Sequence, residues 1–435
     1  MRSTHTDEFL DELAARRAAL PEEPLSMGQC IQLAVENNYD ARMADLDVKL
    51  AELGRGIAFS KFFPQVTLGA DWIKWDKNLP MTDRDYSTAK LSVGVPVIVP
   101  SVWFMYASQK EKQAQAAAMA HYIKQSICLE TMVTYYDCMI SEDEVKVMEK
   151  QVKTARETAE RVRGLTNEGF AKEWEGRQAE AQLAAREVDL SVSKRNYINR
   201  KGRLLNLIGL PPDYSYDVLQ LSGDIGKPLY TGEGIESLIL TALAFHPELE
   251  VADREMVIRE NELRKAIADF LPTLTGFVNA SWTTDDGGHS SNRSMGLNAV
   301  WNVFDGFANV SGYRAAKVSK EKSQLAREQT FLRIMLDVVT ASNSVNDARE
   351  TAEVLGKVFE SLRLKYEDYV ARQREGLIPL SDALDVEAEM YMAQLNMLRS
   401  TYQERVAWAT LNMTMGIMEL PEKIDGDDDN FETIN

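Results

Sequence analysis

The sequence contains two copies of one pattern about 207 residues apart, and this repetition is the feature that most limits the possible fold. In the first copy AVENNYDARMAD precedes FFPQVTLGADW, and in the second copy ALAFHPELEVAD precedes FLPTLTGFVNASW. Asn38 lies 26 residues before Pro64, just as His246 lies 26 residues before Pro272. Further along, EGFAKEWEGRQ and LLNLIG match EGLIPLSDALD and TLNMTMG. So many matches at one offset predict a single architecture with two similar halves.

Each copy is predicted to begin with a helix of about 35 residues, which ends at a Phe-Pro or Leu-Pro step because proline cannot continue a helix. A β-hairpin is expected after each step, at residues 64–98 and 272–303. In both hairpins valine, leucine and tryptophan alternate with threonine, serine, glycine and asparagine. This alternation predicts strands with one apolar and one polar face.

An uninterrupted helical pattern follows each hairpin, roughly over residues 103–168 and 308–375, and would reach about 100 Å at 1.5 Å per residue. Apolar residues recur there at spacings of three and four, as in a coiled coil. The two stripes are Val145, Met148, Val152, Ala155, Ala159 and Val162, and Ala352, Leu355, Phe359, Leu362, Tyr366 and Tyr369. Gly169 and Gly376 then interrupt the pattern before a shorter helix runs back, so each copy predicts a long helical hairpin with glycine at its tip.

The predicted fold class is therefore mostly α with a β-barrel part. Long helices form a coiled-coil barrel, and each chain contributes four strands. The expected organisation along the chain is a poorly ordered N-terminal segment (1–24), repeat 1 (25–212), a connector (213–232), repeat 2 (233–420) and an acidic tail (421–435).

Four strands of about ten residues are too few to close a barrel, since about eight is the smallest number that leaves room for side chains inside. Three chains would supply twelve strands, and a strand of this length tilted by about 45° rises roughly 23 Å, close to the apolar band of an outer-membrane barrel. No apolar run approaches the roughly 18 residues that a transmembrane helix needs. A membrane-spanning barrel completed by partner chains therefore remains open.

In these features the chain resembles the TolC-type outer-membrane efflux proteins. The resemblance covers about residues 25 to 420 and rests on AVENNYD and ALAFHPEL, FFPQ and FLPT, WNVFDGF, and EGLIPLSDALDVEAE, in order and at fixed spacing. It implies a homotrimer in the outer-membrane lipid, with a twelve-stranded barrel and a periplasmic helical tunnel. The hairpin tips, at Gly169 and Gly376, would dock with a periplasmic adaptor protein and an inner-membrane pump. Such a channel is a passive conduit of an efflux or type I secretion system for small molecules or proteins, not an enzyme.

The resemblance also implies a periplasmic gate formed by acidic rings. Two aspartates three residues apart carry this role in the family, and Asp382 and Asp385 occupy those positions here. Their spacing places both on one helix face, so three chains would stack two rings of three carboxylates. The chain departs from the family where the latch often has an arginine, because Ile378 stands there. The matching positions of the first copy hold Glu175 and Gln178, so the acidic pattern is only partly repeated.

Three tryptophans near the strand ends, Trp72, Trp282 and Trp301, are candidates for a membrane-interface belt, the alternative being a soluble β core. The three cysteines favour free thiols. The four histidines show no ligand spacing with cysteine or acidic residues, so neither a metal site nor a cofactor is expected. We find no phosphate loop, nucleophile elbow or catalytic triad. The net charge of −18 argues against nucleic-acid binding.

A soluble coiled-coil scaffold whose short strands form a small cap is the alternative from another class. It is favoured by the first 24 residues, which lack the apolar core of a signal peptide, so that any export signal is expected to have been removed or replaced. A detergent-stable trimer in the outer membrane would distinguish the channel from the scaffold.

Overall fold

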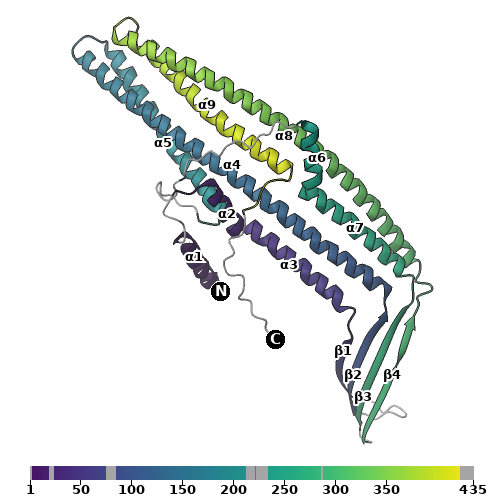
Figure 1. Ribbon diagram of the computed structural model, residues 1–435. Coiled ribbons are helices and arrows are strands. Elements are labelled where there is room, and N and C mark those ends of the chain that lie inside the picture. Colours follow the sequence, from purple (N-terminus) through teal and green to yellow (C-terminus); the bar gives the residue numbers. More distant parts are fainter. Residues whose placement is uncertain are drawn as a thin grey trace. The chain divides into compact units, whose positions relative to one another are not determined.

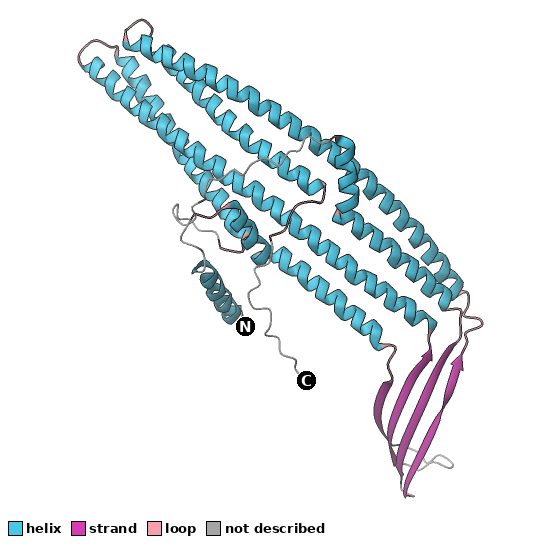
Figure 2. Cartoon of the chain, in the orientation of Figure 1, coloured by secondary structure: helices cyan, strands magenta, loops and turns pink. Residues whose placement is uncertain are grey.

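The computed structural model describes residues 2–18, 24–74, 85–211, 221, 234–285 and 288–421. Helices make up most of this part of the chain, and four antiparallel strands form a single sheet (Figure 2). The predicted mostly helical fold with four strands per chain is confirmed. The expected connector and acidic tail lie outside the described residues, apart from Leu221 and Pro421. No helix in the described part is long and apolar enough to cross a membrane.

The elements of the two copies follow the same order (Figure 1). The first copy contains α2 (Met27–Asn37), α3 (Tyr39–Ser60), β1 (Gln65–Lys74), β2 (Asp85–Ile98), α4 (Pro100–Asn167) and α5 (Glu173–Leu207). The second contains α6 (Ile235–Phe245), α7 (Pro247–Ala268), β3 (Thr273–Asp285), β4 (Gly288–Val300), α8 (Ala308–Arg374) and α9 (Leu380–Thr414). The segment expected to be poorly ordered instead forms α1 (Arg2–Ala18), whose alanine, leucine, arginine and glutamate residues favour helix.

The single helix expected at the start of each copy is wrong, because each copy has two helices with a break between them. Asn38 has extended backbone angles, φ −63° and ψ 134°, and its side-chain oxygen accepts a hydrogen bond from the Asp40 amide at 2.8 Å. An asparagine that caps the following helix in this way ends the preceding one. His246 has φ −68° and ψ 119°, since the residue before a proline, here Pro247, is disfavoured in the helical region.

The second hairpin has a shorter turn than the sequence suggests. The polar segment TTDDGGHSSNRS, expected to be a turn, lies largely within β3 and β4, because polar side chains are compatible with exposed strands. The hairpin was predicted to extend to Val303, but β4 ends at Val300.

The chain divides into two compact units, of which the second comprises Ala44–His121 and Pro247–Leu332. Its sheet has the order β1-β2-β3-β4, and its helices form one layer in the matching order α3, α4, α7, α8 (Figure 1). Each seam between neighbouring helices is marked by a side-chain contact. These contacts are Phe59 with Tyr106 (ring centroids 5.6 Å apart), Arg254 with Glu111 (3.1 Å), and Lys320 with Glu260 (3.7 Å). Thus α3 and β1 form one edge of this unit, and α8 and β4 form the other.

The strand register places most apolar residues of the four strands on one face, which also carries Arg293 of β4. Val93 pairs with Val66 on one side and with Val278 on the other, and Val278 pairs in turn with Met295. Directly paired residues of antiparallel strands point to the same side. The opposite face is mostly polar, apart from residues such as Phe277, and carries an ion pair between Lys90 and Asp71 at 3.0 Å. The alternation predicted for both hairpins is therefore present.

The first unit comprises Met1–Met43, Tyr122–His246 and Arg333–Asn435. Its largest core cluster joins α2 to α4, α5 and α9 through buried residues such as Cys30, Tyr135, Leu204 and Tyr402. The two predicted coiled-coil stripes contribute to a common cluster, in which Met148 of α4 packs with Phe359 and Leu362 of α8 and with residues of α9. The two helical hairpins therefore share a core.

Four glycines end the four long helices with left-handed backbone: Gly169, Gly376, Gly209 and Gly416, with φ between 70° and 81°. At each, the glycine amide bonds to the carbonyl three residues earlier, and the next amide bonds to the carbonyl five residues before it. This is the Schellman motif, which favours glycine because other residues strain at positive φ. The surroundings differ, because a Cβ at Gly209 would lie 2.8 Å from Asn37, and one at Gly416 would lie 2.7 Å from His246.

Replacing Gly209 or Gly416 by alanine is expected to destabilise the protein more than the same change at Gly169 or Gly376. All four substitutions incur the left-handed backbone cost of about 1–2 kcal/mol. At the two tip glycines a Cβ would meet no atom within 4 Å, whereas at the other two it collides with the helix breaks. Thermal unfolding of the purified variants measures the difference, and equal losses in all four would contradict the close approach.

Candidate functional site

The two hairpin tips lie together and expose apolar side chains. Phe170 and Trp174, beside the first tip, are 79 % and 58 % exposed, and Leu377, beside the second, is 68 % exposed. A cavity of about 300 Å³ between the tips is lined by Phe170, Trp174 and Gln178 of the first copy and by Gln373, Pro379 and Leu384 of the second. The two predicted tips, at Gly169 and Gly376, therefore lie against each other across a partly apolar surface. The two glycines form the turns and do not line the cavity.

Asp382 and Asp385 both lie on α9 immediately after the tip, and both are exposed. Asp382 is in the first turn of the helix, where a carboxylate is favoured by the helix dipole. Its counterpart Glu175 occupies the same place in α5, and its carboxylate accepts a hydrogen bond from the Lys172 amide at 3.1 Å. The first copy therefore uses its acid as a helix cap.

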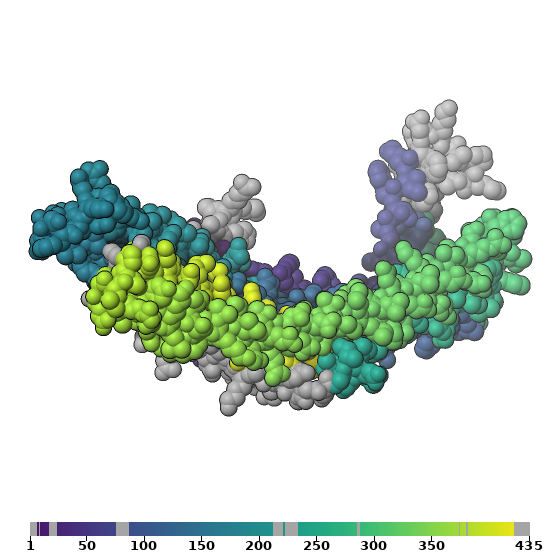
Figure 3. Space-filling model, turned by 90° about the horizontal axis from the view of Figure 1, so that it is seen from above, coloured from purple at the N-terminus to yellow at the C-terminus, as the bar shows by residue number. Residues whose placement is uncertain are grey.

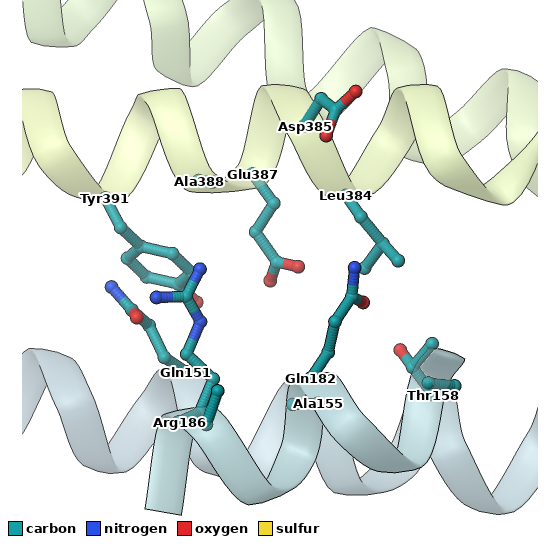
Figure 4. A pocket seen from close by; sticks show the side chains of 12 residues that line it. Gln151, Ala155, Thr158, Gln182, Arg186, Leu384, Asp385, Glu387, Ala388 and Tyr391 are labelled. Carbon is teal, nitrogen blue, oxygen red and sulfur yellow. The ribbon is translucent and has the colours of Figure 1, made fainter. Parts of the chain in front are cut away.

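Glu387 is an acidic residue of this region that the sequence analysis missed. It lies two residues beyond Asp385, so it points to the other side of α9, toward α4 and α5 (Figure 4). Its carboxylate accepts a hydrogen bond from the Tyr366 hydroxyl at 3.3 Å. Burial raises the pKa of Glu387, while the Tyr366 hydrogen bond and the charge of Arg186 oppose that rise. The sequence signal for its burial was its spacing of three or four residues from Ala383, Met390 and Tyr391, which places it on the buried face of α9.

The three tryptophans lie at two ends of the sheet. Trp72 and Trp282 are near the far ends of β1 and β3, whereas Trp301 directly follows β4 near the helices. Trp282 pairs with Ser291, which is ten residues before Trp301, so about 34 Å of strand separates the two levels. The Trp301 indole donates a hydrogen bond to the Phe270 carbonyl at 3.0 Å.

Further aromatic side chains gather where the sheet meets the helices, and the sequence analysis did not single them out. The first group consists of Phe59, Phe62, Phe63, Trp103 and Tyr106, with ring centroids 4.7–6.0 Å apart. In the second copy Phe304 and Phe307 form an edge-to-face pair at 5.4 Å, close in sequence to Trp301. Aromatic residues therefore mark the helical end of both hairpins. The signal was their clustering on either side of the FFP step and within WNVFDGF.

The cysteines are free thiols, as the sequence favours, and all three are buried. Burial raises the pKa of Cys30 and Cys138 to about 12 and that of Cys128 to about 11, so these groups are protonated and unreactive near neutral pH. Within the described ranges no three histidine, cysteine, aspartate or glutamate side chains gather as metal ligands would.

The repeated hairpins, the amphipathic sheet and the paired tips define a class of outer-membrane export channels. The family model described as Outer membrane efflux protein matches residues 30–210 and 238–416, and the chain belongs to this family. The chain is therefore an outer-membrane exit duct, with its helical part in the periplasm. Membership does not favour the soluble-scaffold alternative.

Individual relatives agree with this assignment. The Pyoverdine export outer membrane protein OpmQ of Pseudomonas putida is 20 % identical over 428 residues, which cover 93 % of this chain and 90 % of the relative. The outer-membrane channel OprN superposes with a TM-score of 0.76 at 19 % identity, covering 90 % of this chain and 89 % of OprN. The CmeC outer membrane channel of Campylobacter jejuni also gives 0.76, at 18 % identity, covering 91 % and 87 %. These channels share the fold of this chain.

Replacing Glu387 by glutamine is expected to remove a pH dependence of stability. The pKa of Glu387 is raised from the ordinary value of 4.5, so above that pH the folded state holds a proton that the unfolded state has released. Wild-type stability should therefore fall, relative to the variant, as the pH rises through the raised pKa. Unfolding temperatures compared from about pH 4 to pH 8 test this. Glu389→Gln, an exposed change on the same helix, is the control, and a pH-independent difference between wild type and Glu387→Gln would refute the expectation.

Proposed function

We propose that three copies of this chain associate side by side to form one continuous exit duct across the outer membrane and the periplasm. The observation that carries the proposal is that both edges of the sheet-bearing unit are incomplete. Among the described residues, β1 and β4 each have one neighbouring strand. A strand edge is a template for pairing, and within a membrane every backbone polar group needs a partner.

The helices above those two strands support the same association. On α3, Leu46, Leu50, Leu53 and Ile57 recur at spacings of four and three, and on α8, Val318, Leu325 and Leu332 recur every seven residues. All seven side chains are 57–66 % exposed. Figure 3 shows α8, in green, uncovered along the face turned to the viewer. Such stripes are the seams of coiled coils, and burial of each side chain contributes about 1.5–3 kcal/mol.

A head-to-tail contact of α3 and β1 with α8 and β4 of the next copy uses two different surfaces, and it closes into a ring of three when each copy is rotated by a third of a turn. Three copies give twelve strands, which is within the range of outer-membrane barrels. The apolar sheet face then contacts lipid. The two tryptophan levels, about 34 Å apart along the strand, are about 24 Å apart at a 45° tilt, close to the height of the apolar band. Trp72, Trp282 and Trp301 thus suit the two membrane interfaces.

Beside the second hairpin tip, Asp382 and Asp385 are proposed as the periplasmic gate. Both are exposed on one face of α9, and three copies would bring six carboxylates together in two rings. Closely spaced like charges repel one another and attract cations. The ring therefore favours cations at rest and is opened by separating the tips.

The exposed Phe170, Trp174 and Leu377 are proposed as the surface on which a periplasmic adaptor docks, which in turn connects the duct to an inner-membrane pump. Aromatic side chains exposed beside a groove are typical of interaction surfaces. Similarity to a pyoverdine export protein favours small molecules over proteins as cargo. The duct itself remains a passive conduit.

Replacing Leu50 by glutamate is expected to weaken the trimer, because a carboxylate would be buried without a partner in each of three seams. Val257→Glu makes the same change at an exposed position of α7, which is an inner helix of the layer, and should leave assembly intact. Light scattering of the detergent-solubilised proteins at falling concentration measures the trimer fraction. If both variants dissociate at the same concentration, the seam is not at α3.

Replacing both Asp382 and Asp385 by alanine is expected to raise the resting conductance and to weaken block by multivalent cations, roughly tenfold. Single-channel recordings in planar bilayers provide the measurement. Glu173→Ala, which removes an exposed carboxylate from the other tip, is the matched control. Unchanged conductance and unchanged block in the double variant would remove the gate assignment.

A further inference from the structure

A second cavity, of about 270 Å³, lies between the first hairpin and α9 of the second. Its polar wall is formed from three helices: Gln151 and Thr158 of α4, Gln182 and Arg186 of α5, and Glu387 and Tyr391 of α9 (Figure 4). Asp385 also borders the cavity, but its side chain lies on the side of α9 that faces away from α4 and α5 (Figure 4). Alanine and leucine side chains form the remainder. A small cavity with a few convergent polar groups has the character of a ligand site.

Opposite charges face one another across this cavity. Figure 4 shows the Glu387 side chain directed from α9 toward the first hairpin, and the Arg186 side chain directed from α5 toward α9. The hydrogen-bond donor to Glu387 is the Tyr366 hydroxyl, which is neutral. Arg186 has an ion pair with Asp189 of its own helix at 3.4 Å, in which both side chains are more than a third exposed. Burial raises the pKa of Glu387, as expected of a carboxylate whose charge is only partly compensated.

An independent observation concerns Gln151, whose side chain also lines the cavity. The residue is 7 % exposed, and its side-chain oxygen is buried without a hydrogen-bond partner in the structure. Buried polar atoms in proteins nearly always have a partner, so an orphaned acceptor on a cavity wall indicates a missing donor.

We propose that this cavity binds a small zwitterion, with its ammonium group between Glu387 and the Gln151 oxygen and its carboxylate on Arg186. An ammonium group has three donors, enough to satisfy both acceptors. A simple cation would meet the like charge of Arg186, and a simple anion would meet that of Glu387, so each is disfavoured. The volume corresponds to about nine water molecules, which suits a short amino acid.

A bound zwitterion would bridge the two hairpins, because its charged partners belong to α5 and α9. Ligands that bind only the folded state stabilise it, so occupancy should raise the unfolding temperature. The site and its test do not depend on the gate role of Asp382 and Asp385 or on assembly into a channel. If replacing Asp382 and Asp385 leaves the conductance unchanged, the binding site is unaffected. If no zwitterion binds, the proposed channel function is unaffected.

The test is calorimetric titration and thermal unfolding of the detergent-solubilised full chain with glycine, β-alanine and γ-aminobutyrate, which span increasing distances between the two charges. At least one should bind and raise the unfolding temperature. Methylammonium and acetate, which carry one charge each, should bind at least tenfold more weakly. Glu387→Gln and Arg186→Gln should each weaken binding at least tenfold. Glu389→Gln, which changes an exposed carboxylate outside this cavity, should bind as the wild type does.

Three results would overturn the proposal: failure of all three zwitterions to bind, equal binding of the single-charge compounds, or unchanged binding in both cavity variants. Circular dichroism of each variant establishes that it is folded. Should Arg186→Gln fail to fold, Arg186→Lys keeps the charge but loses the planar geometry, and weakened binding by that variant serves in its place.

Discussion

The need to satisfy backbone hydrogen bonds at the edges of the sheet underlies the rest of the structure. A four-stranded sheet with an apolar face can be stable neither in water, where that face is exposed, nor in lipid, where its edges lack partners. The repeat resolves this by placing an edge strand directly beyond an edge helix on each side, α3 with β1 and α8 with β4. The apolar stripes on those two helices are exposed in the same way as the strand edges. A partner that pairs with the edge strands would therefore also cover the apolar stripes.

The repeat made most of the fold predictable from sequence. A Phe-Pro or Leu-Pro step, alternating strands and a helical pattern with glycine at its end are local signals, and each appears twice. The break at Asn38 was not predictable in this way, because Asn38 acts through its own side chain and through a bond from that side chain to the Leu207 carbonyl at 3.2 Å, which is 169 residues away. The break at His246 has a local signal in Pro247, which the sequence analysis did not use. The short turn of the second hairpin was also missed, since polar residues are compatible with either a turn or an exposed strand.

The candidate site was only partly accessible to sequence reasoning. Asp382 and Asp385 stood out because they match a family pattern, whereas Glu387 matches no family pattern, and its environment depends on the packing of α9 on α4 and α5. The two copies have also diverged in chemistry at one position of the fold. Glu175 caps its helix by accepting a hydrogen bond from the Lys172 amide. The matching acid, Asp382, has no such role, because Pro379 stands in place of Lys172 and has no backbone N–H to donate. Comparing the two copies therefore separates an acid that stabilises a helix end, Glu175, from an acid that is proposed to act in the gate, Asp382.

The four left-handed glycines also determine how this architecture can change in length. Each hairpin is fixed at one end by its tip glycine and at the other by the contact of Gly209 or Gly416 with a helix break, and the arms between are regular helix. Adding seven residues to both arms of a hairpin would preserve the coiled-coil phase and move the tip outward by about 10 Å, leaving both anchors unchanged. If both hairpins lengthened together, the tips would stay level. The span of such a duct can thus be adjusted in steps of two helical turns, without redesign of either end.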